Sequence, residues 1–128
     1  MKNSRISAKE RGLIKGALRR VFSRSDLRKT AVDKSLVKNY HDPLRIRVKR
    51  WSICPECQEY IPTYKMQVDH ISPVIKLTES LDDISWDQLV DRLWCEEDNL
   101  VAICTECHKV KSKNENKERR RLKKEGKK

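Results

Sequence analysis

Hydrophobic residues near the start of the chain recur at helical spacing. One apolar stripe is formed by positions three or four residues apart, namely Leu13, Ile14, Ala17, Leu18, Val21 and Phe22. The segment Ser7-Ala8-Lys9-Glu10 precedes this stripe and matches a capping box, in which Ser and Glu satisfy each other's free backbone N–H groups. The opposite face is basic, with Arg11, Lys15, Arg19 and Arg20. We expect an amphipathic helix that docks through its stripe and points its basic face outward.

Residues 25–50 carry a weak helix signal, then a break, then an alternating pattern. Residues 25–39 carry a weak signal for a second, shorter helix. Pro43 disfavours helix in the residue before it and so breaks the chain. From Arg45 to Arg50, basic and apolar side chains alternate, which is typical of a half-buried strand or an extended arm.

The second half of the chain predicts two strands and two helices. The strands are expected over Tyr64–Ile71, with Met66 and Val68 on one face, and over Leu100–Ile103. Between them, a capping box over Ser85–Gln88 predicts a helix, with Ile84 placed to pack on Leu89 and a stripe that continues through Val90, Leu93 and Trp94. A helix is also allowed from Thr105 onward. Its outer half, residues 114–128, has almost no apolar face, so we expect it to fray or to order only on a partner.

Composition adds a marked charge asymmetry. The 128 residues suffice for one compact domain with tails, and the net charge is +11. Residues 1–50 hold 16 basic and 4 acidic side chains, residues 51–107 hold 3 and 12, and residues 108–128 hold 11 and 3. Basic segments of this density favour a polyanionic partner, most often nucleic acid. The alternative is a set of solvated faces that keep the protein soluble.

The sequence does not predict a membrane span or a signal peptide. The longest apolar run, Leu100–Cys104, is far too short to span a bilayer, and the segment after Met1 is polar and basic rather than like a signal peptide. We therefore expect no membrane association and a cytoplasmic location. Thiols stay reduced in that compartment, so spaced cysteines indicate metal binding before disulfides.

Four cysteines form two pairs with metal-ligand spacing. Cys54 and Cys57 make one Cys-x-x-Cys pair, and Cys104 and Cys107 make the other, with 46 residues between the pairs. Two such pairs supply the four tetrahedral ligands of a closed structural Zn²⁺ site. A redox-active Cys-x-x-Cys is the competing interpretation, but it needs only one pair. Cys95 is expected to be a packed thiol.

The residues between and after these pairs resemble a known family. The order Cys-x-x-Cys, Asp69-His70, Asn99-Leu100, Cys-x-x-Cys-His108 is similar to that of the HNH endonucleases in their zinc-bound ββα-metal form, over residues 54 to about 113. The resemblance implies an α+β fold with a treble-clef-like ββα-metal core, preceded by the amphipathic helix and followed by a basic helix. It also implies three parts: a basic leader and arm (1–50), a nuclease core (51–113) and a basic tail (114–128).

The resemblance assigns a role to each site residue. His70 would be the general base, and Asp69 with His108 would hold a catalytic divalent cation, Mg²⁺ or Mn²⁺. Asn99 would hold the loop that carries His70, although in some members an Asn in this region ligates the metal instead. Some members carry a further histidine four residues after the one at His108, where this chain has Ser112, which argues against a three-histidine site. Lys109 and Lys111 are expected to make plain contacts to the DNA backbone.

The activity implied is metal-dependent hydrolysis of DNA phosphodiester bonds, with 5′-phosphate and 3′-hydroxyl products. A single site reaches one strand at a time, so nicking of double-stranded DNA by a monomer or weak dimer is expected. The three basic segments would grip the duplex. The rival is a non-catalytic, zinc-stabilised module that binds DNA or RNA. A third alternative is an inactive partner within a phage DNA-packaging or mobile-element complex, and a phage origin would place the protein in the host cytoplasm. Taken singly, the motif residues also have plainer interpretations: His70 as a buried histidine bonded to Asp69, His108 as a replacement for one cysteine in a three-sulfur zinc site, and Asn99 as the cap of a turn.

Overall fold

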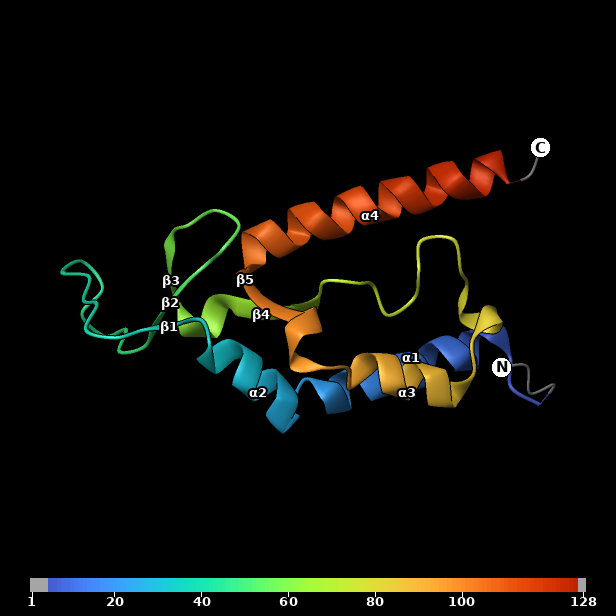
Figure 1. Ribbon diagram of the computed structural model, residues 1–128, viewed down its shortest axis with the longest axis horizontal. Helices are drawn as coiled ribbons and strands as arrows, with labels where there is room; N and C mark the ends of the chain where they lie inside the picture. Colours follow the sequence, from blue (N-terminus) through green and yellow to red (C-terminus); the bar gives the residue numbers. More distant parts are fainter. Residues whose placement is uncertain (1–4, 127–128) are drawn as a thin grey trace.

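The computed structural model describes residues 5–126 and has a mixed α+β fold (Figure 1). Its elements in chain order are α1 (Ala8–Phe22), α2 (Asp26–Asp33), β1 (Leu36–Val37), β2 (Trp51–Ile53), β3 (Tyr60–Pro62), β4 (Met66–His70), α3 (Trp86–Leu93), β5 (Leu100–Cys104) and α4 (Thr105–Glu125). Three short 3₁₀ segments, at residues 63–65, 81–83 and 97–99, precede β4, α3 and β5. None of the described helices combines the length and apolar character needed to cross a bilayer.

The strands form two small antiparallel sheets. The first has the order β1-β2-β3, and the second pairs β4 with β5 from Met66 opposite Cys104 to His70 opposite Leu100. Both strands of the second sheet were predicted, although β4 starts two residues late because residues 63–65 form a 3₁₀ turn. Helix α4 begins directly after β5, so the chain builds a β4-β5-α4 unit. Cys104 lies at one end of the β4–β5 hairpin, and His70 lies at the other end.

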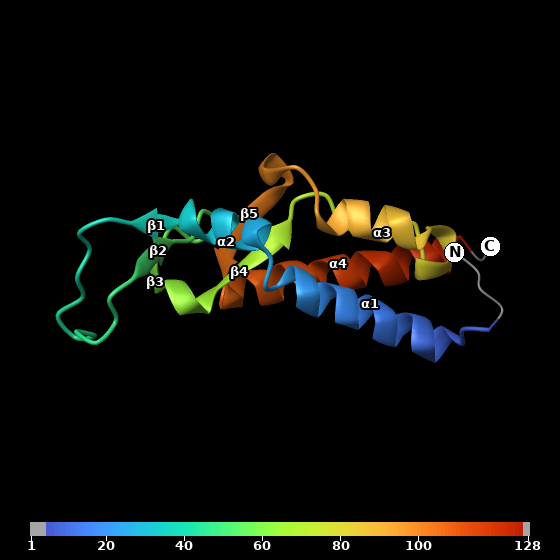
Figure 2. The same cartoon turned by 90° about the horizontal axis from the view of Figure 1, so that it is seen from below.

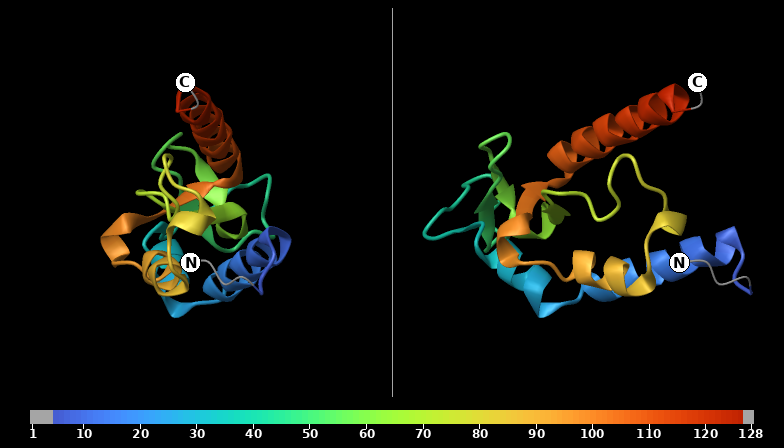
Figure 3. Two further views of the ribbon diagram at one scale, coloured as in Figure 1. Left: turned by 90° about the vertical axis from the view of Figure 1, so that its right-hand side faces the viewer. Right: turned by 45° about the vertical axis from the view of Figure 1, so that its right-hand side comes forward.

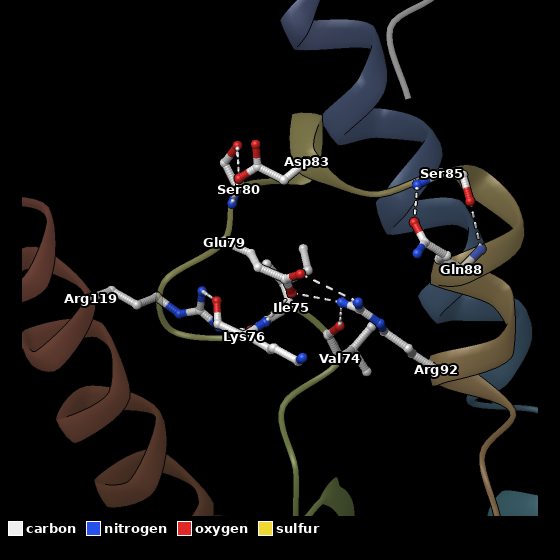
Figure 4. A network of polar contacts seen from close by, with 10 residues as sticks. All are labelled: Val74, Ile75, Lys76, Glu79, Ser80, Asp83, Ser85, Gln88, Arg92 and Arg119. Carbon is white, nitrogen blue, oxygen red and sulfur yellow. Dashed lines mark hydrogen bonds and ion pairs between the residues drawn. The ribbon is translucent and has the colours of Figure 1, made fainter. Parts of the chain in front are cut away.

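Two clusters of buried side chains hold these elements together. The larger cluster lies around α1, α2, α3 and the segment after β4, and includes Phe22, Ala31, Val74, Ile75, Ile84, Leu89, Leu93 and Leu100. The smaller cluster lies at the other end of the β4–β5 hairpin, with Cys54, Met66, Ala102, Ile103 and Cys104. Ile84 and Leu89 are both buried, as the predicted staple requires, and the Ser85–Gln88 capping box is present (Figure 4). Val90, by contrast, is exposed, so the apolar stripe of α3 runs through Leu89 and Leu93.

Helix α1 has the predicted start but not the predicted orientation. Its capping box is confirmed, with Ser7 and Glu10 bonded reciprocally at 3.1 Å. The stripe, however, does not dock as a whole, because Leu13 is 62% exposed and Val21 is 59% exposed. The stripe docks only through Leu18 and Phe22, which pack in the larger cluster. Of the basic face, Arg11 turns toward the protein and pairs with Asp82 at 2.8 Å, whereas Arg19 and Arg20 are exposed as expected. The Asp82 carboxylate gives Arg11 a partner that an apolar side chain would not have.

The basic arm is a loop rather than a strand. Successive turns form where Arg45 N–H donates to the Asp42 carbonyl and Val48 N–H donates to the Arg45 carbonyl. These turns use the backbone groups that a strand ladder would need, so the predicted half-buried strand is wrong. Leu44 is 93% exposed, and the loop extends well beyond the β1-β2-β3 sheet (Figures 1 and 2).

The basic C-terminal segment is a regular helix. Helix α4 continues through Glu125. Residues 114–125 are therefore helical and not frayed as expected. Arg121 pairs with Glu118 and, at 2.6 Å, with Glu125 on the surface of the helix, and such pairs offset the missing apolar face. Residues 127–128 of the predicted tail lie outside the described residues. Helix α4 and the pair α1–α3 run as two arms from the β4–β5 hairpin, with residues 71–80 between them (Figure 3).

Candidate functional site

The four paired cysteines come together in one cluster. All four Sγ atoms of Cys54, Cys57, Cys104 and Cys107 lie within 4.8 Å of one another. A tight turn after β2 presents the first pair: Gln58 takes a φ of 60°, its N–H donates to the Cys54 carbonyl at 2.7 Å, and Cys54 N–H donates to the Glu59 carbonyl at 3.1 Å. Cys104 ends β5 and caps α4, so that Cys107 follows in the first helical turn. The β4–β5 hairpin therefore closes the 46-residue gap.

The chemistry and spacing of this cluster fit a metal ion. Four sulfurs bound to Zn²⁺ at about 2.3 Å lie about 3.8 Å apart, and the Sγ atoms of Cys57 and Cys104 are 3.9 Å apart. Burial raises the pKa of the Cys54 thiol, but the N–H groups of Cys104, Cys57 and Glu56 outweigh it and lower that pKa to about 7. The pKa of Cys107 is raised, mainly by its hydrogen bond with the Cys104 sulfur. Adjacent thiolates repel, so a divalent cation is what allows all four to ionise together. Cys95 lies outside the cluster and packs, half-buried, against the larger core, as predicted.

A pocket of about 390 Å³ collects the other predicted residues. Asp69 and His70 enter it from the end of β4, and His108 enters it from the first turns of α4. The Asp69 Oδ1 and His108 Nε2 atoms are 3.9 Å apart. Its remaining walls come from α1, from residues 73–75 and from further along α4. Three residues separated by up to 39 positions in sequence thus share one cavity.

His70 is held in a defined tautomer. Its Nε2 lies 2.9 Å from the Leu93 carbonyl oxygen, which can only accept, so Nε2 carries the proton and Nδ1 is the ring nitrogen left to accept one. The ring is 8% exposed and packs on Phe22 with centroids 5.2 Å apart. Burial lowers the pKa of His70, so the imidazole is neutral at pH 7.

The two oxygens of Asp69 face different partners. Oδ2 contacts the ammonium group of Lys111, and Oδ1 faces His108. Lys111 thus neutralises a site carboxylate, a role that the sequence did not predict. Two ligands about 2.1 Å from one ion lie roughly 3 to 4.2 Å apart, so the 3.9 Å between Oδ1 and Nε2 fits a single Mg²⁺ or Mn²⁺. Ser112, one helical turn beyond His108, lines the same pocket with a hydroxyl.

Asn99 acts on the chain segment after His70 rather than on the pocket. Its side-chain Oδ1 accepts from Ser72 N–H at 2.8 Å, its Nδ2 donates to the Ser72 carbonyl at 3.5 Å, and its own carbonyl accepts from Ile71 N–H at 2.8 Å. The described residues that line the pocket do not include Asn99. Its place therefore fits holding the loop and does not fit binding a metal there.

Several pocket residues were missed by sequence reasoning. Lys15 and Arg19 of α1 and Glu115, Asn116 and Arg119 of α4 also line the cavity. A signal for part of this set was available. His108, Ser112, Glu115 and Arg119 recur every three or four residues, so they share one face of α4. Likewise, Lys15 and Arg19 are four residues apart on α1, but their charge was read as an outward grip for DNA.

Comparison of the chain with protein-family models, with curated proteins and with solved structures finds no match.

Proposed function

We propose that this protein is a metal-dependent endonuclease that hydrolyses DNA phosphodiester bonds, and that β4, β5 and α4 form a ββα-metal core. The observation that supports it most is the pocket shared by Asp69, His70 and His108. A structural module that only binds nucleic acid has no need of a neutral, oriented imidazole beside a carboxylate–imidazole pair. The resemblance to HNH endonucleases points to the same three residues.

In this proposal His70 is the general base. A water molecule positioned in line with the scissile P–O3′ bond transfers a proton to Nδ1 of His70 as its oxygen attacks phosphorus. The Leu93 carbonyl, bonded to Nε2, fixes the ring and stabilises the imidazolium that forms. Cleavage of the P–O3′ bond leaves a 5′-phosphate and a 3′-oxygen, which takes a proton from solvent.

Asp69 Oδ1 and His108 Nε2 would hold the catalytic Mg²⁺ or Mn²⁺. When bound, such a cation neutralises charge on the scissile phosphate and the departing oxygen. We assign the four cysteines to a structural zinc, because four thiolates fill its tetrahedral shell and leave no position for substrate. Asn99 is a positioning residue for the loop after His70.

The test is relaxation of supercoiled plasmid by zinc-loaded protein in Mg²⁺ or Mn²⁺. We expect wild type to nick, and His70→Ala to lose about 10²- to 10⁴-fold in rate, the usual contribution of a general base. His41→Ala is the matched control, since His41 lies exposed in the loop before the arm and should leave nicking unchanged.

Gel-shift binding in parallel separates this proposal from its rival. If wild type and His70→Ala both bind duplex DNA or RNA and neither cuts with either metal, the protein is a zinc-stabilised binding module. Ligation of the nicked product without prior phosphorylation tests the expected 5′-phosphate and 3′-hydroxyl ends.

A further inference from the structure

Three cationic side chains converge on the pocket from opposite ends of the chain. Lys15 and Arg19 come from α1, and Arg119 comes from the outer half of α4. The two helices form the facing arms seen in Figures 1 and 3, and the pocket lies between them. The same cavity holds Asp69, His70 and His108, so these cations lie beside the proposed chemistry.

The pocket's own carboxylates offset only part of this charge. The pocket's two carboxylates, Asp69 and Glu115, are both engaged by Lys111, which contacts Asp69 and lies 3.6 Å from Glu115. Within residues 5–126, neither Lys15 nor Arg19 forms an ion pair. The cavity therefore has an excess of positive charge even before a divalent cation binds.

Arg119 is held in place by the segment between the arms (Figure 4). Its guanidinium donates to the Lys76 carbonyl at 3.0 Å and to the Ile75 carbonyl. From the other side, Arg92 of α3 donates to the Val74 carbonyl at 3.0 Å and pairs with Glu79 at 2.7 Å. The segment 74–79 is thus tied to both arms and fixes Arg119 at the pocket. Among the residues that the structure describes, Arg119 has no carboxylate partner.

Holding these cations together has an electrostatic cost. Partial desolvation, followed by repulsion from Arg19 and Arg119, lowers the pKa of Lys15. Partial desolvation and Arg119 likewise lower the pKa of Arg19, although Asp69 opposes the shift. A bound anion would remove this repulsion, and a phosphate oxygen accepts charge-assisted hydrogen bonds from guanidinium and ammonium groups alike.

We propose that Lys15, Arg19 and Arg119 form a phosphate clamp inside the pocket. The ligand is a phosphate group of a nucleic-acid backbone; this assignment of its source rests on the proposed function, whereas the anion site itself rests on the convergence of the cations. A cavity of about 390 Å³ accommodates a phosphate with an adjoining sugar. The N-terminal helix is then part of the substrate pocket rather than an external grip.

The first experiment measures binding of inorganic phosphate to the full-length, zinc-loaded protein by calorimetry, without Mg²⁺ and at constant ionic strength. We expect Arg19→Gln to weaken binding at least about tenfold, the value of one charge-assisted hydrogen bond. Arg20→Gln is the matched control, because Arg20 is the next residue, exposed and outside the pocket lining; it should bind phosphate within about twofold of wild type. Lys15→Gln gives a second, independent reading, and circular dichroism verifies that each variant is folded.

The second experiment compares plasmid nicking by wild type and Arg19→Gln. If wild type does not nick but Arg19→Gln loses phosphate binding, the clamp stands and the nuclease proposal fails. If wild type nicks and Arg19→Gln lowers kcat/KM at least about tenfold, both stand. If Arg19→Gln and Lys15→Gln bind phosphate like wild type, or if Arg20→Gln weakens binding as much as they do, the clamp is wrong.

Discussion

Removal of zinc should unfold the cysteine end of the molecule. The smaller core cluster has five buried residues, of which Cys54 and Cys104 are themselves expected ligands. The others are Met66, Ala102 and Ile103. Burial of Met66 and Ile103 contributes about 1.5–3 kcal/mol each, and Ala102 contributes less, so these three side chains together contribute roughly 4–7 kcal/mol.

That sum is small beside the contribution of the metal. Binding of structural zinc to four cysteines typically releases about 10–16 kcal/mol at pH 7, and an entire domain is stable by only about 5–15 kcal/mol. Ordering the β2–β3 hairpin alone opposes folding by about 1–2 kcal/mol per residue. We therefore expect the cysteine end to lose its structure without zinc, while the larger cluster around Leu89 and Leu93 retains part of its packing.

The assay is hydrogen exchange with mass spectrometry after complete zinc removal, with residual metal measured by elemental analysis. Amides of β2, β3 and β5 should lose protection first, and zinc but not Mg²⁺ should restore it. A metal-free, reduced protein with unchanged protection and circular dichroism would refute the reasoning. If amide protection instead depends on an oxidant and the isolated protein contains no zinc, the result supports the redox interpretation of the Cys-x-x-Cys pairs.

Three further outcomes are expected. Leu89→Ala removes a fully buried side chain from the larger cluster and should destabilise the protein by about 2–5 kcal/mol in urea unfolding. Asn99→Ala removes both side-chain hydrogen bonds to Ser72 and should slow nicking while leaving phosphate affinity unchanged, as calorimetry and plasmid relaxation together would measure. Burial lowers the pKa of His70, and protonation abolishes its role as base; nicking should therefore persist below the ordinary histidine pKa of about 6.5 and fall only at lower pH, as a pH–rate profile would reveal.

Local signals predicted much of the fold. The capping boxes at Ser7 and Ser85 place the starts of α1 and α3 because their hydrogen bonds involve only neighbouring residues. The strands β4 and β5 were also expected, each beside part of the motif. The orientation of α1 could not be predicted in the same way. It depends on what lies opposite each turn of the helix, and Asp82, the partner of Arg11, comes from a segment about 70 residues further along.

The candidate site shows the same division. The motif predicted Asp69, His70 and His108, because these residues share a short, recognisable order. It did not predict Lys15, Arg19 or Arg119, whose place depends on the way α1 and α4 flank residues 71–80. The charge pattern predicted a polyanionic partner, which stays a prediction, and it assigned those residues to the outer surface. Tertiary packing decides which cations line a pocket.

The cysteine cluster lies at the opposite end of the β4–β5 hairpin from the pocket with His70. In the β4–β5 register, Cys104 lies opposite Met66, whereas His70 lies opposite Leu100 at the other end of the hairpin. Four residues of strand separate the two ends by about 13 Å, so a metal bound by the four sulfurs would be too far away to take part in the proposed reaction at His70.

Its effect must instead pass through α4, which begins where the cysteines lie. Contacts then proceed in order along that helix: His108 meets Asp69, Lys111 reaches the carbonyl of His70 at 3.2 Å, and Arg119 binds the carbonyls of residues 75 and 76. A helix advances only about 1.5 Å per residue, so a shift of one position at its start would displace every one of these contacts. A metal bound by Cys104 and Cys107 would fix that start, and in this way the proposed structural site would determine the geometry of the proposed catalytic site.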